Sequence, residues 1–133
     1  MIDIFLDFEM NPVSRRKYPK QAKILSREII QIGAVAVEDE TFREVSSYRK
    51  LVKPDFNDRI PKQYEDLTGI STAQVAQADH FDRALPDFVA WCMSFHDELS
   101  LYAWSGSDLA QVTREILAKR IPITEEMQYL FCY

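Results

Sequence analysis

The first residues of the chain alternate between large apolar side chains and a mixed set of acidic and apolar ones. Every even position from Ile2 to Phe8 is apolar, and the odd positions carry three acids and one phenylalanine. A period of two is typical of a β-strand, because successive side chains point to opposite faces. Since apolar residues occur on both faces, we predict a strand over residues 2–9 in a central position of a sheet.

Two more strands are predicted after a polar interval. Residues 11–26 contain two prolines and a run of basic side chains, which indicates a mobile loop. Residues 29–37 are almost continuously apolar or small, as expected of a strand covered on both faces. After a turn at residues 38–41, residues 42–53 mix charged and apolar side chains, which favours a strand at the edge of the sheet.

Helical signals begin after the third strand. Pro61 can open a short helix that Gly69 closes, and Ser71 or Thr72 can cap a second short helix. Apolar residues at helical spacing then predict a longer helix over residues 82–95.

The last third of the chain predicts a strand, a helix and the start of another strand. Residues 99–104 form the strand, and Ser107 caps the helix. The predicted buried face of that helix consists of Leu109, Val112, Ile116 and Leu117. Residues 129–133 are predicted to begin a fifth strand. This order of elements indicates an α/β domain with a mixed sheet.

Composition narrows the class of protein. The chain has 133 residues, 47% hydrophobic and 28% charged, which is the size and balance of one globular domain. Its net charge of −5 argues against a protein that covers nucleic acid with a broad basic face. A nuclease is still compatible with that charge, because bound divalent cations reverse the local sign of an acidic pocket.

The N-terminus and the cysteines indicate the cellular compartment of the protein. Acidic residues interrupt the apolar N-terminal run, and no basic region precedes it, so we expect neither a signal peptide nor a membrane span. A cytoplasmic protein is expected. Cys92 and Cys132 have no metal-ligand spacing and are predicted to be buried thiols.

Three carboxylates are candidates for a metal site. Asp7 and Glu9 leave the same face of a strand, roughly 6 to 7 Å apart along the backbone. Both can therefore reach one hard divalent cation, and Asp108 follows at a strand-to-helix junction. The alternative interpretation is that the pair marks the solvated end of a strand and that Asp108 merely complements a helix dipole. A central strand favours the metal site, because buried ionised groups need partners.

Four segments resemble a known family. They are Asp7-Phe8-Glu9, residues 27–33, residues 67–70, and Trp104 four residues before Asp108. In this order and spacing the chain resembles the DnaQ-like 3′→5′ exonucleases of the DEDD superfamily, in particular their ERI-1/KapD-type branch. The resemblance implies a ribonuclease H-like α/β fold, with a mixed central sheet of about five strands flanked by helices.

The resemblance also implies a function and a site. Such enzymes use two Mg²⁺ or Mn²⁺ ions to release nucleoside monophosphates from 3′ ends of single-stranded RNA or DNA. Asp7 and Glu9 match the first exonuclease motif and Asp108 matches the second, as catalytic residues and metal ligands. The matching positions for contact with the terminal nucleotide are Met10, Leu67 and Thr68, which are otherwise interpreted as packing and turn residues.

The chain departs from the family at the third motif, a histidine five residues before an aspartate. His80 and His96 are each followed five residues later by a leucine, so both are interpreted as surface or helix-end residues. The general base and the fourth carboxylate are thus missing. We therefore expect residues 1–133 to be a single exonuclease domain that is incomplete at its C-terminus. It is then a fragment or a proteolysed core of a longer protein, or a naturally short protein whose open edge a second copy or a partner covers.

Two other functions stay open at this point. One is a catalytically inactive module that keeps the fold and binds nucleic acid or a protein partner. The other is an acidic domain unrelated to nucleic acids. The basic residues from Arg15 to Lys23 either help to hold a phosphate backbone or belong to a solvated connection.

Overall fold

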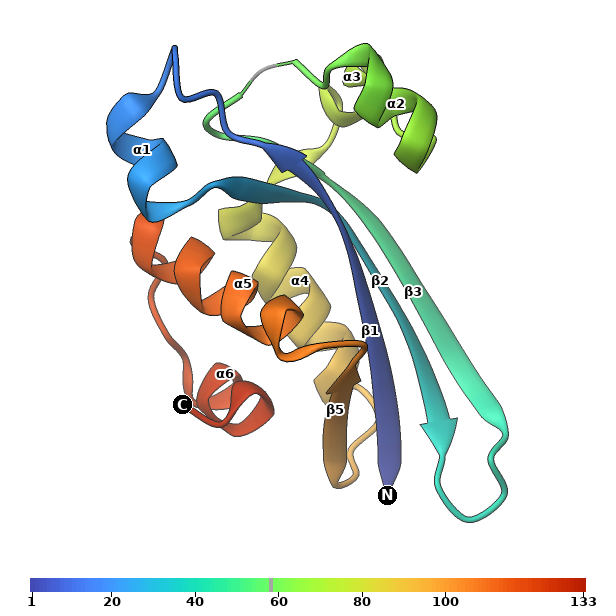
Figure 1. The fold of residues 1–133 in the computed structure, drawn as a ribbon. Helices are drawn as coiled ribbons and strands as arrows, with labels where there is room; N and C mark the ends of the chain where they lie inside the picture. Colours follow the sequence, from blue (N-terminus) through green and yellow to red (C-terminus); the bar gives the residue numbers. More distant parts are fainter. Residues whose placement is uncertain (58) are drawn as a thin grey trace.

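A mixed sheet organises the protein, which we describe from a computed structural model covering residues 1–57 and 59–133. Figure 1 shows three long strands crossing the molecule side by side, with a shorter strand next to the first. The strands in this part of the chain are β1 (Ile2–Pro12), β2 (Arg27–Glu38), β3 (Glu44–Lys53), β4 (Asp79–His80) and β5 (Leu99–Ala103). Their order in the sheet is β4-β3-β2-β1-β5. The prediction that the first strand is central is confirmed, because β1 lies between β2 and β5.

The strand directions make the sheet mixed. β2 runs antiparallel to both β1 and β3, whereas β5 runs parallel to β1 and β4 runs parallel to β3. β4 pairs only with Val52 and Lys53, so most of β3 is an edge strand, as predicted.

Helices join these strands and cover one face of the sheet. They are α1 (Pro19–Ile24), α2 (Lys62–Thr68), α3 (Thr72–Val75), α4 (Phe81–Met93), α5 (Gly106–Ala118) and α6 (Glu125–Phe131). α4 and α5 pack on the sheet, and α2 and α3 lie together beyond one end of it (Figure 1). Gly69 ends α2 in the left-handed conformation at φ 75°, which glycine adopts without strain. None of the helices in the described ranges is both long and apolar enough to cross a bilayer.

The main core lies between the sheet and these helices. Ile2, Ile4, Leu6 and Phe8 of β1 are buried there in one cluster with aromatic and aliphatic side chains of α4 and α5. The other face of the sheet is exposed over Phe5, Val35 and Tyr102. The prediction that both faces of β2 are covered is therefore wrong for this strand, since Val35 is 37% exposed.

The C-terminal residues are helical, so the prediction of a strand over residues 129–133 is wrong. The hydroxyl oxygen of Thr124 accepts the backbone N–H of Met127 and caps α6. Met127 and Leu130 are buried and lie three residues apart, which is helical spacing. Packing of this face decides the element, against the β-propensity of the aromatic side chains that follow.

Four smaller predictions also need correction. α5 is capped by Ser105 and begins at Gly106, two residues before the predicted start. Leu117 of α5 is 67% exposed, and the helix buries two polar residues instead. Cys92 is buried as predicted, whereas Cys132 is exposed at the end of the chain. The predicted loop over residues 11–26 contains the end of β1 and the short helix α1.

Candidate active site

Asp7 and Glu9 lie on the part of β1 where its pairing with β2 is regular. Asp7 is opposite Gly33 and Glu9 is opposite Gln31, and the register shifts immediately afterwards, between Glu9 and Met10. Gly33 has no side chain, which leaves space next to Asp7. A surface hollow of about 450 Å³ includes Asp7, Gly33 and Trp104 in its lining.

Asp108 reaches the same region through β5. The parallel pairing places Ala103, the last residue of β5, beside Leu6 of β1. The chain then turns into α5, and Asp108 lies in the first turn of this helix. Because Leu6 directly precedes Asp7, this register brings the start of α5 to the acidic end of β1.

The charge of Asp7 acts on both other acids. Burial raises the pKa of Glu9, and the neighbouring Asp7 raises it further. Burial also raises the pKa of Asp108, Asp7 adds to this, and Arg27 acts in the opposite direction. Asp7 is thus the common neighbour of the other two carboxylates, and a bound cation would relieve this like-charge repulsion.

The carboxylate ligands suit a hard cation, but the side chains are not arranged as a complete coordination site. Carboxylate oxygens are the ligands that Mg²⁺ and Mn²⁺ prefer. Within residues 1–57 and 59–133, no three His, Cys, Asp or Glu side chains are arranged to hold one metal ion. Asp7 is exposed, and Glu9 and Asp108 are half-buried, so burial does not by itself require a partner for Asp7.

The three predicted substrate-binding residues lie on two elements. Met10 follows Glu9 on β1 and packs partly against the main core. Leu67 and Thr68 are the last residues of α2, and Leu67 is 80% exposed. The hydroxyl of Thr68 donates to the Tyr64 carbonyl at 2.7 Å and accepts the N–H of Ile70 at 3.1 Å.

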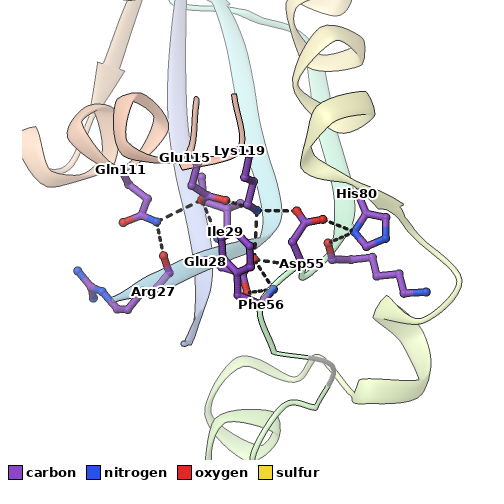
Figure 2. A network of polar contacts seen from close by, with 10 residues as sticks. Arg27, Glu28, Ile29, Asp55, Phe56, His80, Gln111, Glu115 and Lys119 are labelled. Carbon is purple, nitrogen blue, oxygen red and sulfur yellow. Dashed lines mark hydrogen bonds and ion pairs between the residues drawn. The ribbon is translucent and has the colours of Figure 1, made fainter. Parts of the chain in front are cut away.

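The sequence did not predict a buried polar network that joins α5 to β2 and to the loop after β3 (Figure 2). Its centre is the ammonium group of Lys119, which lies 2.8 Å from Glu115, 3.2 Å from Glu28 and 3.0 Å from Asp55. The side chains of Glu28 and Glu115 are fully buried, and that of Lys119 is 6% exposed. His80 directly precedes α4 and its ring lies 3.0 Å from Asp55, which agrees with its interpretation as a helix-end residue.

The network also satisfies backbone groups. Glu28 accepts the N–H groups of Asp55 and Phe56 at 2.7 and 3.1 Å. Glu115 accepts the N–H of Ile29 at 2.8 Å, beyond the stretch in which β2 pairs with β3. These contacts tie α5 to β2 and to the loop after β3, and thereby hold the helix that carries Asp108.

The two charged groups of α5 in this network respond differently to burial. Burial raises the pKa of Glu115, although Lys119 acts against this. Burial alone would lower the pKa of Lys119, but the charges of Glu115 and Glu28 outweigh it and raise that pKa. The spacing of four residues between Glu115 and Lys119 was visible in the sequence, but it is equally typical of an exposed helical ion pair.

Comparison with known families gives one extensive match. The family RNase T, described as "Exonuclease", matches residues 4–130. A curated relative, the 3′-5′ exonuclease crn-4 of Caenorhabditis elegans, is 32% identical over 117 residues. That alignment covers 84% of this chain and 37% of the relative.

Solved structures share the fold. The nuclease domain of 3′hExo, a DEDDh family member bound to rAMP, has a TM-score of 0.77 at 21% identity, covering 96% of this chain and 64% of that one. Cell-death related nuclease 4 (CRN-4) has a TM-score of 0.77 at 23% identity, covering 96% of this chain and 43% of that one. The predicted ribonuclease H-like fold, with a mixed five-stranded sheet flanked by helices, is confirmed.

The chain spans less than two thirds of the length of each of these proteins. The residues predicted to form the first two exonuclease motifs lie within the matched range, on β1 and at the start of α5. Since the family match extends over nearly the whole sequence, this chain belongs to the RNase T family of exonucleases.

Proposed function

We propose that this protein is a divalent-metal-dependent 3′→5′ exonuclease that releases nucleoside monophosphates from 3′ ends of single-stranded RNA or DNA. The observation that carries the proposal is the position of Asp7, whose charge raises the pKa of both Glu9 and Asp108. An acid that repels two neighbouring acids beside a central strand suits a cation-dependent reaction on a phosphodiester. Residues 1–133 would form one exonuclease domain around the main core.

Asp7, Glu9 and Asp108 would hold Mg²⁺ or Mn²⁺. When bound, a pair of such ions stabilises charge on the attacking and leaving oxygens of the phosphodiester. Met10, Leu67 and Thr68 would contact the terminal nucleotide. The exposed side chain of Leu67 can pack against a base, whereas the hydroxyl of Thr68 is already engaged within α2 and its C-terminal turn.

RNA is the first substrate to test. One structural neighbour is described as bound to rAMP, and another as a 3′-exonuclease recognising a histone mRNA stem-loop. These ligands are those of the neighbours, and the present chain offers no motif that reads a 2′-hydroxyl. RNA and DNA oligonucleotides of the same sequence should therefore be compared directly.

Replacing Asp7 with Asn tests the site. We expect the release of nucleotides from a 3′-labelled oligonucleotide in Mn²⁺ to fall to background, because the carboxylate shared by the other two acids becomes neutral. Asp3→Asn is the matched control, since Asp3 lies on β1 and its side chain leaves the same face as Asp7. Unchanged trimming by the Asp7→Asn protein would refute the assignment.

The second candidate is a catalytically inactive module that binds nucleic acid. Two observations favour it. No histidine precedes an aspartate by five residues in this sequence. Among the described residues, no three side chains are arranged to coordinate one metal ion. This candidate predicts that wild-type protein binds the oligonucleotide but releases no mononucleotide at any Mg²⁺ or Mn²⁺ concentration.

A further inference from the structure

Residues 15–27 form a basic segment in an acidic protein. Six of the 16 basic residues lie in this stretch, and no acid occurs between Met10 and Arg27. The other 10 basic residues stand against all 21 acids, so the rest of the chain has a net charge of −11. The six basic residues of the segment are Arg15, Arg16, Lys17, Lys20, Lys23 and Arg27.

All six of these side chains are exposed, so they are open to a polyanion. Lys20 and Lys23 belong to α1. Arg15 and Lys23 line a surface hollow of about 500 Å³ together with Pro19 and Ala22. Such a run would repel itself unless an anion neutralises it, which suggests an anionic ligand rather than a neutral or cationic one.

The segment is joined to the candidate active site at both ends. It begins three residues after the end of β1, the strand that carries Asp7 and Glu9. It ends at Arg27, the first residue of β2, whose partner in the sheet is Pro12. The carbonyl oxygen of Arg27 accepts the side-chain amide of Gln111, three residues after Asp108 on α5, at 2.6 Å. The positive charge therefore begins at the end of β1 that follows the acids and continues over α1, which contacts α5 (Figure 1).

We propose that the basic segment is a track for the phosphates of a single strand whose 3′ end lies at Asp7, Glu9 and Asp108. This inference rests on the proposed function and adds a place for the nucleotides on the 5′ side of the terminal one. The contacts are to the backbone, so they select for chain length rather than for base sequence. A mononucleotide would not reach them.

Charge reversal at Arg15 tests the track. The test uses an oligonucleotide of about 15 nucleotides, the Asp7→Asn background, and chelator in place of metal, so that binding is measured apart from cleavage. Arg15→Glu should weaken binding several-fold for every base sequence. It should also flatten the plot of log K against log salt concentration by about 0.7, the value for one lost phosphate contact on a single strand.

Arg43→Glu is the matched control, because it makes the same change of net charge at an exposed arginine. Arg43 lies at the β2–β3 hairpin, at the opposite end of the sheet from α1 (Figure 1). Affinity for AMP should be the same in both variants and in the unreversed protein. Equal weakening of oligonucleotide binding by the two reversals, or no weakening by Arg15→Glu, would overturn the track.

The two proposals fail separately. If wild-type protein releases no nucleotides but Arg15→Glu still flattens the salt dependence, the exonuclease proposal fails and the track stands. If wild-type protein trims oligonucleotides and Arg15→Glu trims and binds them equally well, the track fails and the exonuclease proposal stands.

Discussion

Asp7, Glu9 and Asp108 differ in exposure although they are proposed to act together. Asp7 is exposed, and the other two are half-buried, so the charge of Asp7 is the one best placed to attract a cation from solvent. The raised pKa of Glu9 and of Asp108 follows from burial and from this neighbouring charge. The chemistry of each carboxylate thus depends on how far it is buried and on its distance from the charge of Asp7.

The two cysteines provide a prediction at the same scale. Burial raises the pKa of Cys92 from 9.0 to about 12, whereas Cys132 is exposed. Native protein at pH 8 should therefore expose one thiol to a disulfide reagent, and a second should react only after unfolding. Cys132→Ser should remove the fast thiol and Cys92→Ser the slow one. Two fast thiols in the native protein would contradict the burial of Cys92.

The pH dependence has a definite sign. Because the pKa of Cys92 is raised in the folded state, its neutral thiol favours folding relative to the thiolate. This contribution is fully present below pH 9 and is lost as the pH rises toward about 12. We therefore expect the slow thiol to stay protected in native protein throughout the range from pH 7 to 9.

At the scale of elements, α5 has two roles. Its first turn presents Asp108, and its C-terminal end enters the buried network through Glu115 and through Lys119, which directly follows the helix. Because the helix is rigid, contacts near its C-terminal end also fix the position of its N-terminal end. The network therefore helps to position the site, although none of its members is a proposed metal ligand.

Replacing Lys119 with Met tests this docking. The change keeps an unbranched side chain of similar length but leaves two fully buried carboxylates without a cation, so we expect the free energy of unfolding to fall by about 3–5 kcal/mol. Urea unfolding followed by circular dichroism measures it. Lys62→Met is the control, because Lys62 forms an exposed ion pair with Asp66, for which about 0.5 kcal/mol is typical. Similar losses in the two variants would refute a special role for Lys119.

At the scale of the whole molecule, one main core draws on nearly the entire chain. Its buried members extend from Ile2 on β1 to Leu130 on α6 and include residues of α4 and α5. A second, smaller cluster around Ile30 packs α2 and α3 onto β2. Since β2 contributes to both clusters, neither can separate without exposing part of the other.

We therefore expect a single cooperative unfolding transition. Circular dichroism and tryptophan fluorescence should give the same midpoint in urea. The two tryptophans suit this test, because Trp91 packs against the core on α4, whereas Trp104 is 91% exposed after β5. In a Trp104→Phe variant the fluorescence change reports the core alone. Two separate transitions in that variant would contradict a common core.

Much of the local structure was determined by the sequence alone. Alternation of apolar residues predicted β1 and its central place, and the family motifs predicted the fold that the comparisons confirm. The side-chain period of a strand is visible in neighbouring residues, so it can be read locally. The order of the motifs can be read along the sequence without knowledge of the fold. At the C-terminus the same approach failed, because Met127 and Leu130 take their helical form from burial against distant elements.

Only the tertiary structure decided how the candidate site is assembled. The pairing of Ala103 with Leu6 brings Asp108 to Asp7 across about 100 residues of sequence, and the contact of Glu115 with Ile29 spans 86 residues. No local pattern records such contacts. Lys119 looks like an ordinary helix-end lysine in the sequence, and it becomes a buried cation only because Glu28 and Asp55 arrive from other elements. Periodicity specifies which face a residue takes, whereas its neighbours across the fold determine its charge environment.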